Sequence, residues 1–261
     1  MKTVFTTILL FMSAITLLAQ YNPTINKLVW AEEFNYEGHP NPEFWGYEEG
    51  YIRNKEAQYY TRRNLSNVRV DDGCLVIEAR KEKKDTMNYT SGSINTLGNV
   101  DIYLGRVEVR AKIPTGVGSW PAIWLLGTDR TQVGWPECGE IDMMENVGYD
   151  PKRMHFTIHT PGTKKDGNKV KRTATLLADD AFTEFHEYAL EWYEDRLDFF
   201  FDKKLVLSYK KDENLPEYWR FDKPHYLLLN LAVGGGWGGA RGIDYSIFPL
   251  QYYVDWVRYY K

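Results

Sequence analysis

The chain has little cysteine, because Cys74 and Cys138 are the only two such residues in a sequence of 261. Two thiols cannot build the disulfide framework of a small exported domain, so the fold must rely on its hydrophobic core. One bridge between them is conceivable. Nothing in the sequence brings the two residues together, and we therefore expect both thiols to be free.

The chain also lacks an excess of positive charge. Lysine and arginine number 32 against 36 acidic residues, which gives a formal net charge of −4. Nucleic acids and anionic membrane surfaces are bound by clustered basic residues, so neither partner is indicated. Long amphipathic helices, repeats and low-complexity linkers are missing too, and the length fits a single domain over residues 20–261.

The N-terminus carries the pattern of a secretory signal. Lys2 precedes an apolar stretch from Val4 to Leu18, and small and polar residues follow it. The stretch is shorter than most membrane spans, and cleavage after Ala19 would leave no membrane attachment. We therefore assign residues 1–19 to a signal peptide and expect a secreted or periplasmic protein. An uncleaved N-terminal anchor is the alternative.

Strand patterns dominate the chain after residue 27. In Arg106–Ile113 apolar and charged residues alternate, which predicts a strand with one core face and one wet face. Similar patterns cover residues 75–80, 188–192, 197–201, 226–233 and 253–259. Asp202–Lys204 is a predicted hairpin turn, and Asn214–Phe221 is predicted to hold a helical turn. Short strands separated by frequent turns indicate an all-β sandwich.

Three acidic residues lie close together in an otherwise apolar, strand-like run. Alternation along a strand puts Glu140 and Asp142 on one face. Glu145 joins them only if a β-bulge at Met143–Met144 inserts one residue. Because crowded carboxylates repel one another and cost desolvation free energy, a chemical role explains them better than a structural one.

Paired carboxyl groups are the catalytic equipment of glycoside hydrolysis. One attacks or assists the anomeric carbon, and the other protonates the leaving oxygen. The alternative is a solvated acidic hairpin edge. The acids of such an edge would alternate with polar residues rather than with isoleucine and methionine, so the spacing favours a glycosidase.

The run Glu140–Glu145 resembles the active-site strand of glycoside hydrolase family 16, in the longer form typical of laminarinases, agarases and carrageenases. Other segments resemble family motifs in family order, namely residues 28–34, 54–61, 105–110, 120–124, 185–192 and 254–259. The resemblance covers residues 27–261. It implies a β-jelly roll of two curved antiparallel sheets, with the concave sheet forming a substrate cleft.

The resemblance also implies roles for the three acids. Glu140 would be the nucleophile, Asp142 its helper and Glu145 the acid/base of a double displacement that retains configuration. Three carboxyls so close together cannot all be charged, so their titrations are coupled and their pKa values spread apart. No cofactor is required for this chemistry.

Aromatic residues, which make up 15% of the chain, supply candidates for sugar binding. Flat rings stack on the apolar faces of sugars. The tryptophan candidates are Trp120, Trp124, Trp135 and Trp237. Core packing is the alternative for each of them.

Two amides and one histidine match family positions that contact the substrate. By resemblance, Asn54 and Asn230 bind glucose units on the nonreducing side, with turn or sheet-edge amides as the alternative. His159 would contact the sugar or the acid group. A metal site at His155 and His159 is not favoured, because no third ligand is placed to complete it.

Two family features concern other positions. Ser93 replaces an arginine that in many laminarinase relatives contacts the sugar two units from the cut, which leaves the exact glucan linkage open. Family members often hold a structural calcium on the convex face. Glu33, Gly73 and Asp255 occupy comparable places, and oxygen ligands suit calcium, although ordinary surface acids explain them equally well.

The leading hypothesis is a secreted, monomeric, retaining endo-β-glucanase. Its substrate would be laminarin-like β-1,3-glucan or mixed-linkage β-1,3/1,4-glucan, and Asn54–Tyr60 is the feature that favours glucan over agar or carrageenan. A non-catalytic glucan-binding module, a transglycosylase and a galactan hydrolase of the agarase or carrageenase type are the alternatives. The presence of both Glu140 and Glu145 argues against the binding module.

Overall fold

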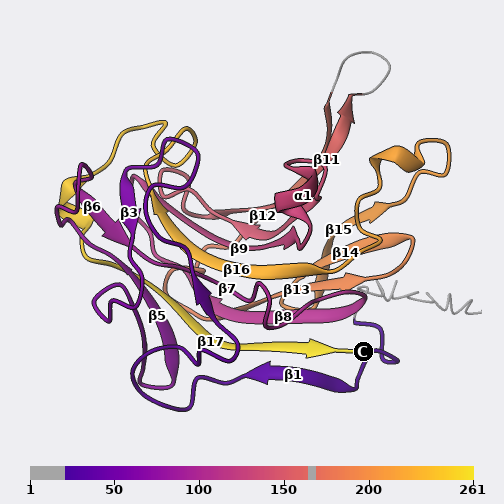
Figure 1. The fold of residues 1–261 in the computed structure, drawn as a ribbon, viewed down its shortest axis with the longest axis horizontal. Helices are drawn as coiled ribbons and strands as arrows, with labels where there is room; N and C mark the ends of the chain where they lie inside the picture. Colours follow the sequence, from indigo (N-terminus) through magenta and orange to yellow (C-terminus); the bar gives the residue numbers. More distant parts are fainter. Residues whose placement is uncertain (1–20, 164–168) are drawn as a thin grey trace, which may run out of the picture.

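The computed structural model describes residues 21–163 and 169–261. The signal peptide predicted for residues 1–19 lies outside these ranges. No helix among the described residues is long and apolar enough to cross a membrane. Two large antiparallel sheets pack against each other (Figure 1), which confirms the predicted all-β jelly-roll sandwich.

One sheet, here called the outer sheet, has the strand order β15-β14-β13-β8-β17-β5-β4, and β1 pairs with the C-terminal part of β17. Its strands are β1 Leu28–Glu32, β4 Val68–Asp71, β5 Cys74–Ala79, β8 Gly105–Lys112, β13 His186–Trp192, β14 Arg196–Phe201, β15 Lys204–Lys210 and β17 Leu250–Tyr260. The strands expected from alternation in this sheet are all present.

The other sheet, here called the cleft sheet, has the order β12-β11-β10-β9-β16-β7-β2. Its strands are β2 Gly46–Tyr47, β7 Ser93–Asn95, β9 Ser119–Gly127, β10 Glu140–Glu145, β11 Arg153–Thr163, β12 Lys169–Leu177 and β16 His225–Val233. The sheet is visibly curved along β16, and loops rise from both of its ends (Figure 1).

Shorter elements complete the described fold. Strands β3 Gln58–Tyr60 and β6 Tyr89–Ser91 form a parallel pair. The helical elements are α1 Arg130–Val133, η1 Pro216–Tyr218 and η2 Tyr245–Ile247. The turn η1 lies inside the predicted segment 214–221. Asp202 and Lys203, with φ of 46° and 65°, make the predicted turn between β14 and β15.

The outward face of β8 is less wet than the alternation predicted. Arg106 and Glu108 are only 8% and 5% exposed. The segment at Tyr21 covers them, because the Arg106 guanidinium lies 4.5 Å from the Tyr21 ring centroid and also pairs with Glu108 and Glu191. Alternation identifies the core face correctly, but it cannot show that another segment of the chain covers the opposite face.

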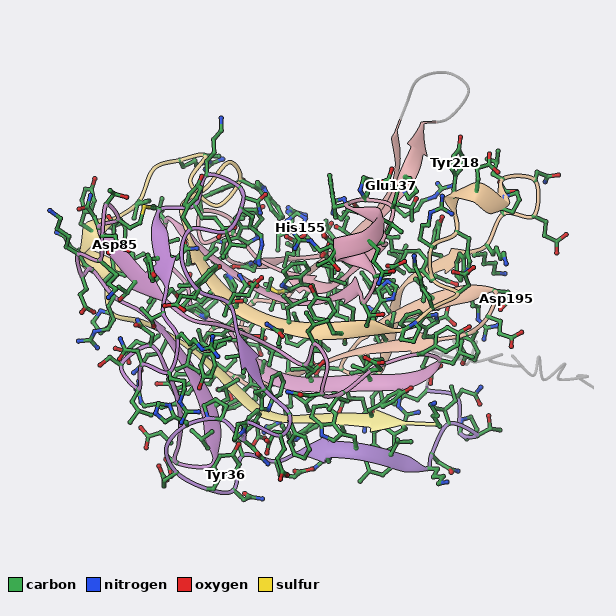
Figure 2. The ribbon with its side chains drawn as sticks, viewed as in Figure 1. Tyr36, Asp85, Glu137, His155, Asp195 and Tyr218 are labelled. Atoms are coloured by element: carbon green, nitrogen blue, oxygen red, sulfur yellow. The ribbon has the colours of Figure 1, made fainter. Side chains whose placement is uncertain are left out.

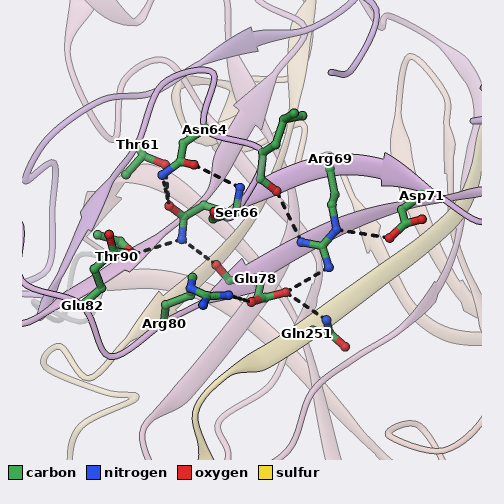
Figure 3. A network of polar contacts seen from close by, with 12 residues as sticks. Thr61, Asn64, Ser66, Arg69, Asp71, Glu78, Arg80, Glu82, Thr90 and Gln251 are labelled. Atoms are coloured by element: carbon green, nitrogen blue, oxygen red, sulfur yellow. Dashed lines mark hydrogen bonds and ion pairs between the residues drawn. The ribbon is translucent and has the colours of Figure 1, made fainter. Parts of the chain in front are cut away.

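A polar network fixes the loop region that precedes β4. The buried Asn67 amide donates to the Glu78 carbonyl and to Thr90 Oγ1, while its oxygen accepts from Thr61 Oγ1 at 2.8 Å. The Glu78 carboxylate in turn accepts from Arg69 and Arg80 (Figure 3). These contacts tie the segment between β3 and β4 to β5 and β6, and the loop that reaches the cleft lies directly before β3.

The predicted bulge is present in β10. Asp142 pairs with Trp124 of β9, but Met144 pairs with the very next residue, Ile123, so Met143 is the extra residue. Against β11, the partners step from Thr157 to His155 while β10 advances from Asp142 to Glu145. Both methionines are fully buried in the core between the sheets, and the alternation is reset before Glu145.

The turn after β10 depends on a close backbone approach at Gly148. A Cβ on Gly148 would lie 1.7 Å from the Gly116 carbonyl oxygen and 2.4 Å from Ser119 Oγ. We expect Gly148→Ala to destabilise the fold by about 1–3 kcal/mol or more, because backbone must move to relieve the clash. Gly46→Ala is the control, since its Cβ would make an ordinary 3.4 Å contact. Equal midpoints of urea unfolding for the two variants would contradict this expectation.

Candidate active site

The floor of the cleft is built by alternation along β9. Ile123 and Leu125 point into the core between the sheets, so Trp120, Ala122 and Trp124 point to the opposite face. The neighbouring strand β16 adds Asn230 and Ala232, which pair with Ala122 and Trp120. Small alanines between large aromatic rings leave room above the sheet, and this room is the centre of the site.

The bulge brings all three acids to this face. A pocket, here called the central pocket, is lined by Arg53, Asn54, Glu56, Trp120, Ala122, Trp124, Glu140, Asp142, Glu145, Asn230 and Ala232. A second pocket, here called the side pocket, also contains Glu140 and is lined by Glu48, Arg53, Trp124, Leu126, Arg130, Trp135 and Glu140. Glu140 thus stands where the two pockets meet, and the cleft extends to both sides of it.

Each acid has a defined neighbour. His159 Nε2 lies 3.1 Å from Asp142 Oδ2 and 3.6 Å from Glu140 Oε1. The Trp135 indole N–H donates to Glu140 Oε2 at 2.9 Å, and the Trp120 indole N–H donates to Glu145 Oε1 at 3.1 Å. His159 therefore contacts Asp142 and Glu140, while its contact with a sugar stays a prediction, and the two tryptophans hold the glutamates at opposite ends of the acidic row.

The Glu140 carboxyl group has an unusually high pKa. The pKa of Glu140 is raised to about 8, first by burial and then by the negative charges of Asp142 and Glu145. His159 and the Trp135 N–H act in the opposite direction but do not cancel these effects. Burial and like charge therefore make the ionised form of Glu140 costly, and the closeness of the carboxyls couples their protons.

Glu140, Asp142 and His159 also satisfy the spacing of a metal site. Each offers one donor atom, and these atoms lie within 4.8 Å of one another. Among the described residues this is the one His/Asp/Glu group with such spacing. Glycoside hydrolysis by two carboxyls needs no metal, and the same closeness is what couples their protons.

Trp120, which lines the central pocket beside Glu145, belongs to a cluster of aromatic rings. The Trp120 and Trp237 rings meet edge to face with centroids 5.5 Å apart, and the His155 ring lies 4.8 Å from Trp237. In Figure 2, His155 lies over the cleft sheet, whereas Tyr36 and Asp195 lie at the periphery. At the other end Trp135 is 52% exposed, so its ring is open to a sugar.

A buried carboxylate, Glu56, organises the two predicted amides. It accepts hydrogen bonds from Asn54 Nδ2 at 3.1 Å and from the Tyr60 hydroxyl at 3.2 Å. Asn230 Nδ2 donates to that hydroxyl, and Asn230 Oδ1 accepts from the Trp124 indole N–H. The orientation of both amides is thus set by one chain of hydrogen bonds, which begins at a residue that sequence reasoning did not select.

Trp124 differs from the other tryptophan candidates. It is only 7% exposed, and the Arg53 guanidinium lies 5.0 Å from its ring centroid. Little of the ring is therefore open to a sugar. Arg53 and Glu56 flank the predicted Asn54 in the sequence, and their charge next to a candidate substrate amide was the signal that could have identified them.

The calcium candidates lie together but already have partners. Strand β17 pairs with β5 up to Val254 and with β1 from Val257, so its Asp255 lies between Gly73 and Glu33. The Asp255 carboxylate pairs with Arg110, and Glu33 pairs with Arg258 at 2.7 Å. Both carboxylates are paired with arginine, and a calcium ion at these residues stays a prediction.

The two cysteines are free, as expected. Cys74 opens β5 of the outer sheet, whereas Cys138 is buried just before β10 of the cleft sheet. Cys138 packs on the cleft side with Trp124, Leu126 and Tyr226. It therefore supports the floor of the side pocket as a small apolar residue.

A jelly roll with coupled carboxyls in a groove open to both sides is the architecture of a glycoside hydrolase. Residues 55–258 match the family model described as Glycosyl hydrolases family 16. The chain belongs to glycoside hydrolase family 16.

Individual relatives agree with this assignment. A beta-glucanase of Rhodothermus marinus is 42% identical over 251 residues, which cover 90% of this chain and 85% of the relative. The X-ray structure of the laminarinase from Rhodothermus marinus matches with a TM-score of 0.85 and 41% identity, covering 90% of this chain and 97% of that one. A keratan-sulfate endo-1,4-beta-galactosidase of Sphingobacterium multivorum is 34% identical over 246 residues, 90% of this chain but 55% of that relative.

Glu140→Gln tests the raised pKa of Glu140. Because the pKa rises from 4.5 to about 8 on folding, the stabilisation from this proton is complete below pH 4.5 and is lost as the pH rises through about 8. The glutamine variant has no such loss. We expect it to exceed the parent in stability by more than about 1 kcal/mol near pH 9, with the difference shrinking towards pH 4.5. Urea unfolding measures this, and a difference independent of pH would refute the raised pKa.

Proposed function

We propose that the protein is a secreted, retaining endo-β-glucanase that hydrolyses β-1,3-glucan or mixed-linkage β-1,3/1,4-glucan. The observation that carries the proposal is the position of Glu140, between two pockets and beside Asp142 and Glu145. A polysaccharide can occupy the cleft on both sides of such a centre, which suits cleavage within a chain. The glucanase and laminarinase relatives support glucan as the substrate.

The proposed reaction is a double displacement. The ionised Glu140 carboxylate attacks the anomeric carbon, while Glu145 gives its proton to the departing glycosidic oxygen. Water then attacks the glycosyl-enzyme ester, Glu145 takes the proton of that water, and Glu140 is released as a carboxylate. The contact of His159 with Asp142 and Glu140 helps to compensate their charge when the proton of the row resides on Glu145.

The direction of the substrate follows from these roles. Glu145 and Trp120 lie on the side of the leaving group, so the side pocket at Trp135 would hold the sugars that become attached to Glu140. Stacking on the exposed Trp135 ring would orient them, whereas the amide of Asn54 lines the central pocket and would bind the part of the substrate that lies there. The protein would act as a monomer, and its export would depend on residues 1–19.

One alternative substrate has a specific observation in its favour. The keratan-sulfate endo-1,4-beta-galactosidase covers as much of this chain as the beta-glucanase does. A galactan hydrolase with the same carboxyl chemistry is therefore the second candidate. A transglycosylase would use the same intermediate with a sugar as the acceptor.

A substrate panel separates these possibilities. We expect new reducing ends from laminarin and lichenan, with products of many lengths early in the reaction, and none from agarose, carrageenan or keratan sulfate. Glycan chains longer than the starting substrate would indicate transglycosylation. Reducing ends released from a galactan but not from laminarin would replace the glucanase assignment.

The catalytic roles are tested by two substitutions and one control. Glu140→Gln should lower kcat on laminarin by more than about 1000-fold, because an amide cannot attack the anomeric carbon. Glu145→Ala should lose more activity on natural glucan than on aryl glucosides, whose leaving groups need little acid help. Glu137→Gln, an exposed neighbour of the row, should keep parental activity. Equal losses for Glu145→Ala on both substrate types would reject its acid role.

A further inference from the structure

Arg53 is the one residue outside the acidic row and Trp124 that lines both pockets. It stands in the loop that directly precedes β3, next to the predicted substrate residue Asn54. Its side chain is 18% exposed, so the guanidinium is largely withdrawn from bulk water although it borders the cleft.

The guanidinium is held from two sides. Arg53 Nη2 donates to Glu48 Oε1, and Glu48 Oε2 accepts from Ser93 Oγ at 2.6 Å. The Arg53 guanidinium carbon lies 5.0 Å from the ring centroid of Trp124, and the Trp124 indole is itself fixed by Asn230. A side chain braced by a carboxylate and an aromatic face has little rotamer freedom left, so it loses little entropy when a ligand binds.

The braced group still has unused donors. Arg53 Nη1 is buried and has no hydrogen-bond partner among the described residues. A guanidinium carries several N–H donors, and leaving a buried one without an acceptor costs free energy. Arg258 makes the contrast clear, because it also stacks on a tryptophan but gives both Nε and Nη2 to Glu33.

We propose that Arg53 is a specificity-determining residue, whose guanidinium donates hydrogen bonds to a hydroxyl oxygen of the sugar bound in the side pocket next to Glu140. Trp124 then acts as the support of Arg53 rather than as a stacking platform. This inference rests on the proposed function for the orientation of the chain and for the identity of the sugar.

The proposal predicts a loss of affinity that is separate from catalysis. We compare binding of laminarihexaose to Glu140→Gln and to Glu140→Gln/Arg53→Met by calorimetry, so that hydrolysis does not interfere. We expect the Arg53→Met substitution to weaken binding roughly ten- to hundredfold, because it removes hydrogen bonds from a charged group. Arg53→Lys, which keeps the charge but not the fork of donors, should recover only part of this loss.

Arg258→Met is the matched control, since it removes an arginine stacked on Trp256 in the outer sheet. It should leave the affinity unchanged. Affinity within about twofold of the parent for a folded Arg53→Met variant would overturn the proposal. If that variant does not fold, Arg53→Lys carries the same test.

A double-mutant cycle separates direct contact from a merely structural role. Laminari-oligosaccharides that lack one hydroxyl are bound to both proteins, and the hydroxyl that meets Arg53 is the one whose removal weakens the parent but not Arg53→Met. If the effects of Arg53→Met and of hydroxyl removal on the binding free energy were additive for every hydroxyl, a direct contact would be rejected.

The test also distinguishes this inference from the proposed function. If Glu140→Gln binds no β-glucan, the glucanase assignment fails. The same comparison is then made with an oligosaccharide of the polysaccharide that the parent hydrolyses.

Discussion

The bulge at Met143 is the constraint on which the site depends. A strand has only two faces, and Glu140, Asp142 and Glu145 cannot share one of them by regular alternation, because the last two are three positions apart along the chain. The extra residue moves Glu145 to the side of Glu140 and sends both methionine side chains into the core. Burial of these methionines stabilises a backbone irregularity that serves the cleft, so the packing between the sheets and the geometry of catalysis are a single problem.

In the carboxyl row, the needs of catalysis oppose those of stability. Burial and like charge make an ionised Glu140 costly, yet a nucleophile must ionise. The indole N–H groups at the two ends of the row and His159 between them offset part of the cost of ionising the carboxyls. Function at this site is therefore tied to a local loss of stability, and the large core and the outer sheet have to offset it.

Periodicity within single segments predicted the all-β sandwich and the strand positions, and the bulge was predicted from the need for Glu145 to share a face with Glu140 and Asp142. What the sequence could not predict depends on segments far apart in the chain. Trp124 matched a stacking position, but the loop before β3 brings Arg53 over its ring. Arg106 and Glu108 looked solvent-facing until the segment at Tyr21 was seen to cover them. Contacts between distant segments leave no trace in the spacing of either one, so these residues needed the structure.

The bulge also bears on how the family could diversify. Deleting Met144 would restore plain alternation, with one methionine towards the core and the following glutamate still on the cleft face beside Asp142. The strands with and without Met144 place the same acids on the same surface. They differ in whether one or two methionine side chains fill the core behind the acids. A single-codon deletion would therefore keep the three acids on one surface, and the core beneath β10 would have to repack around the lost methionine.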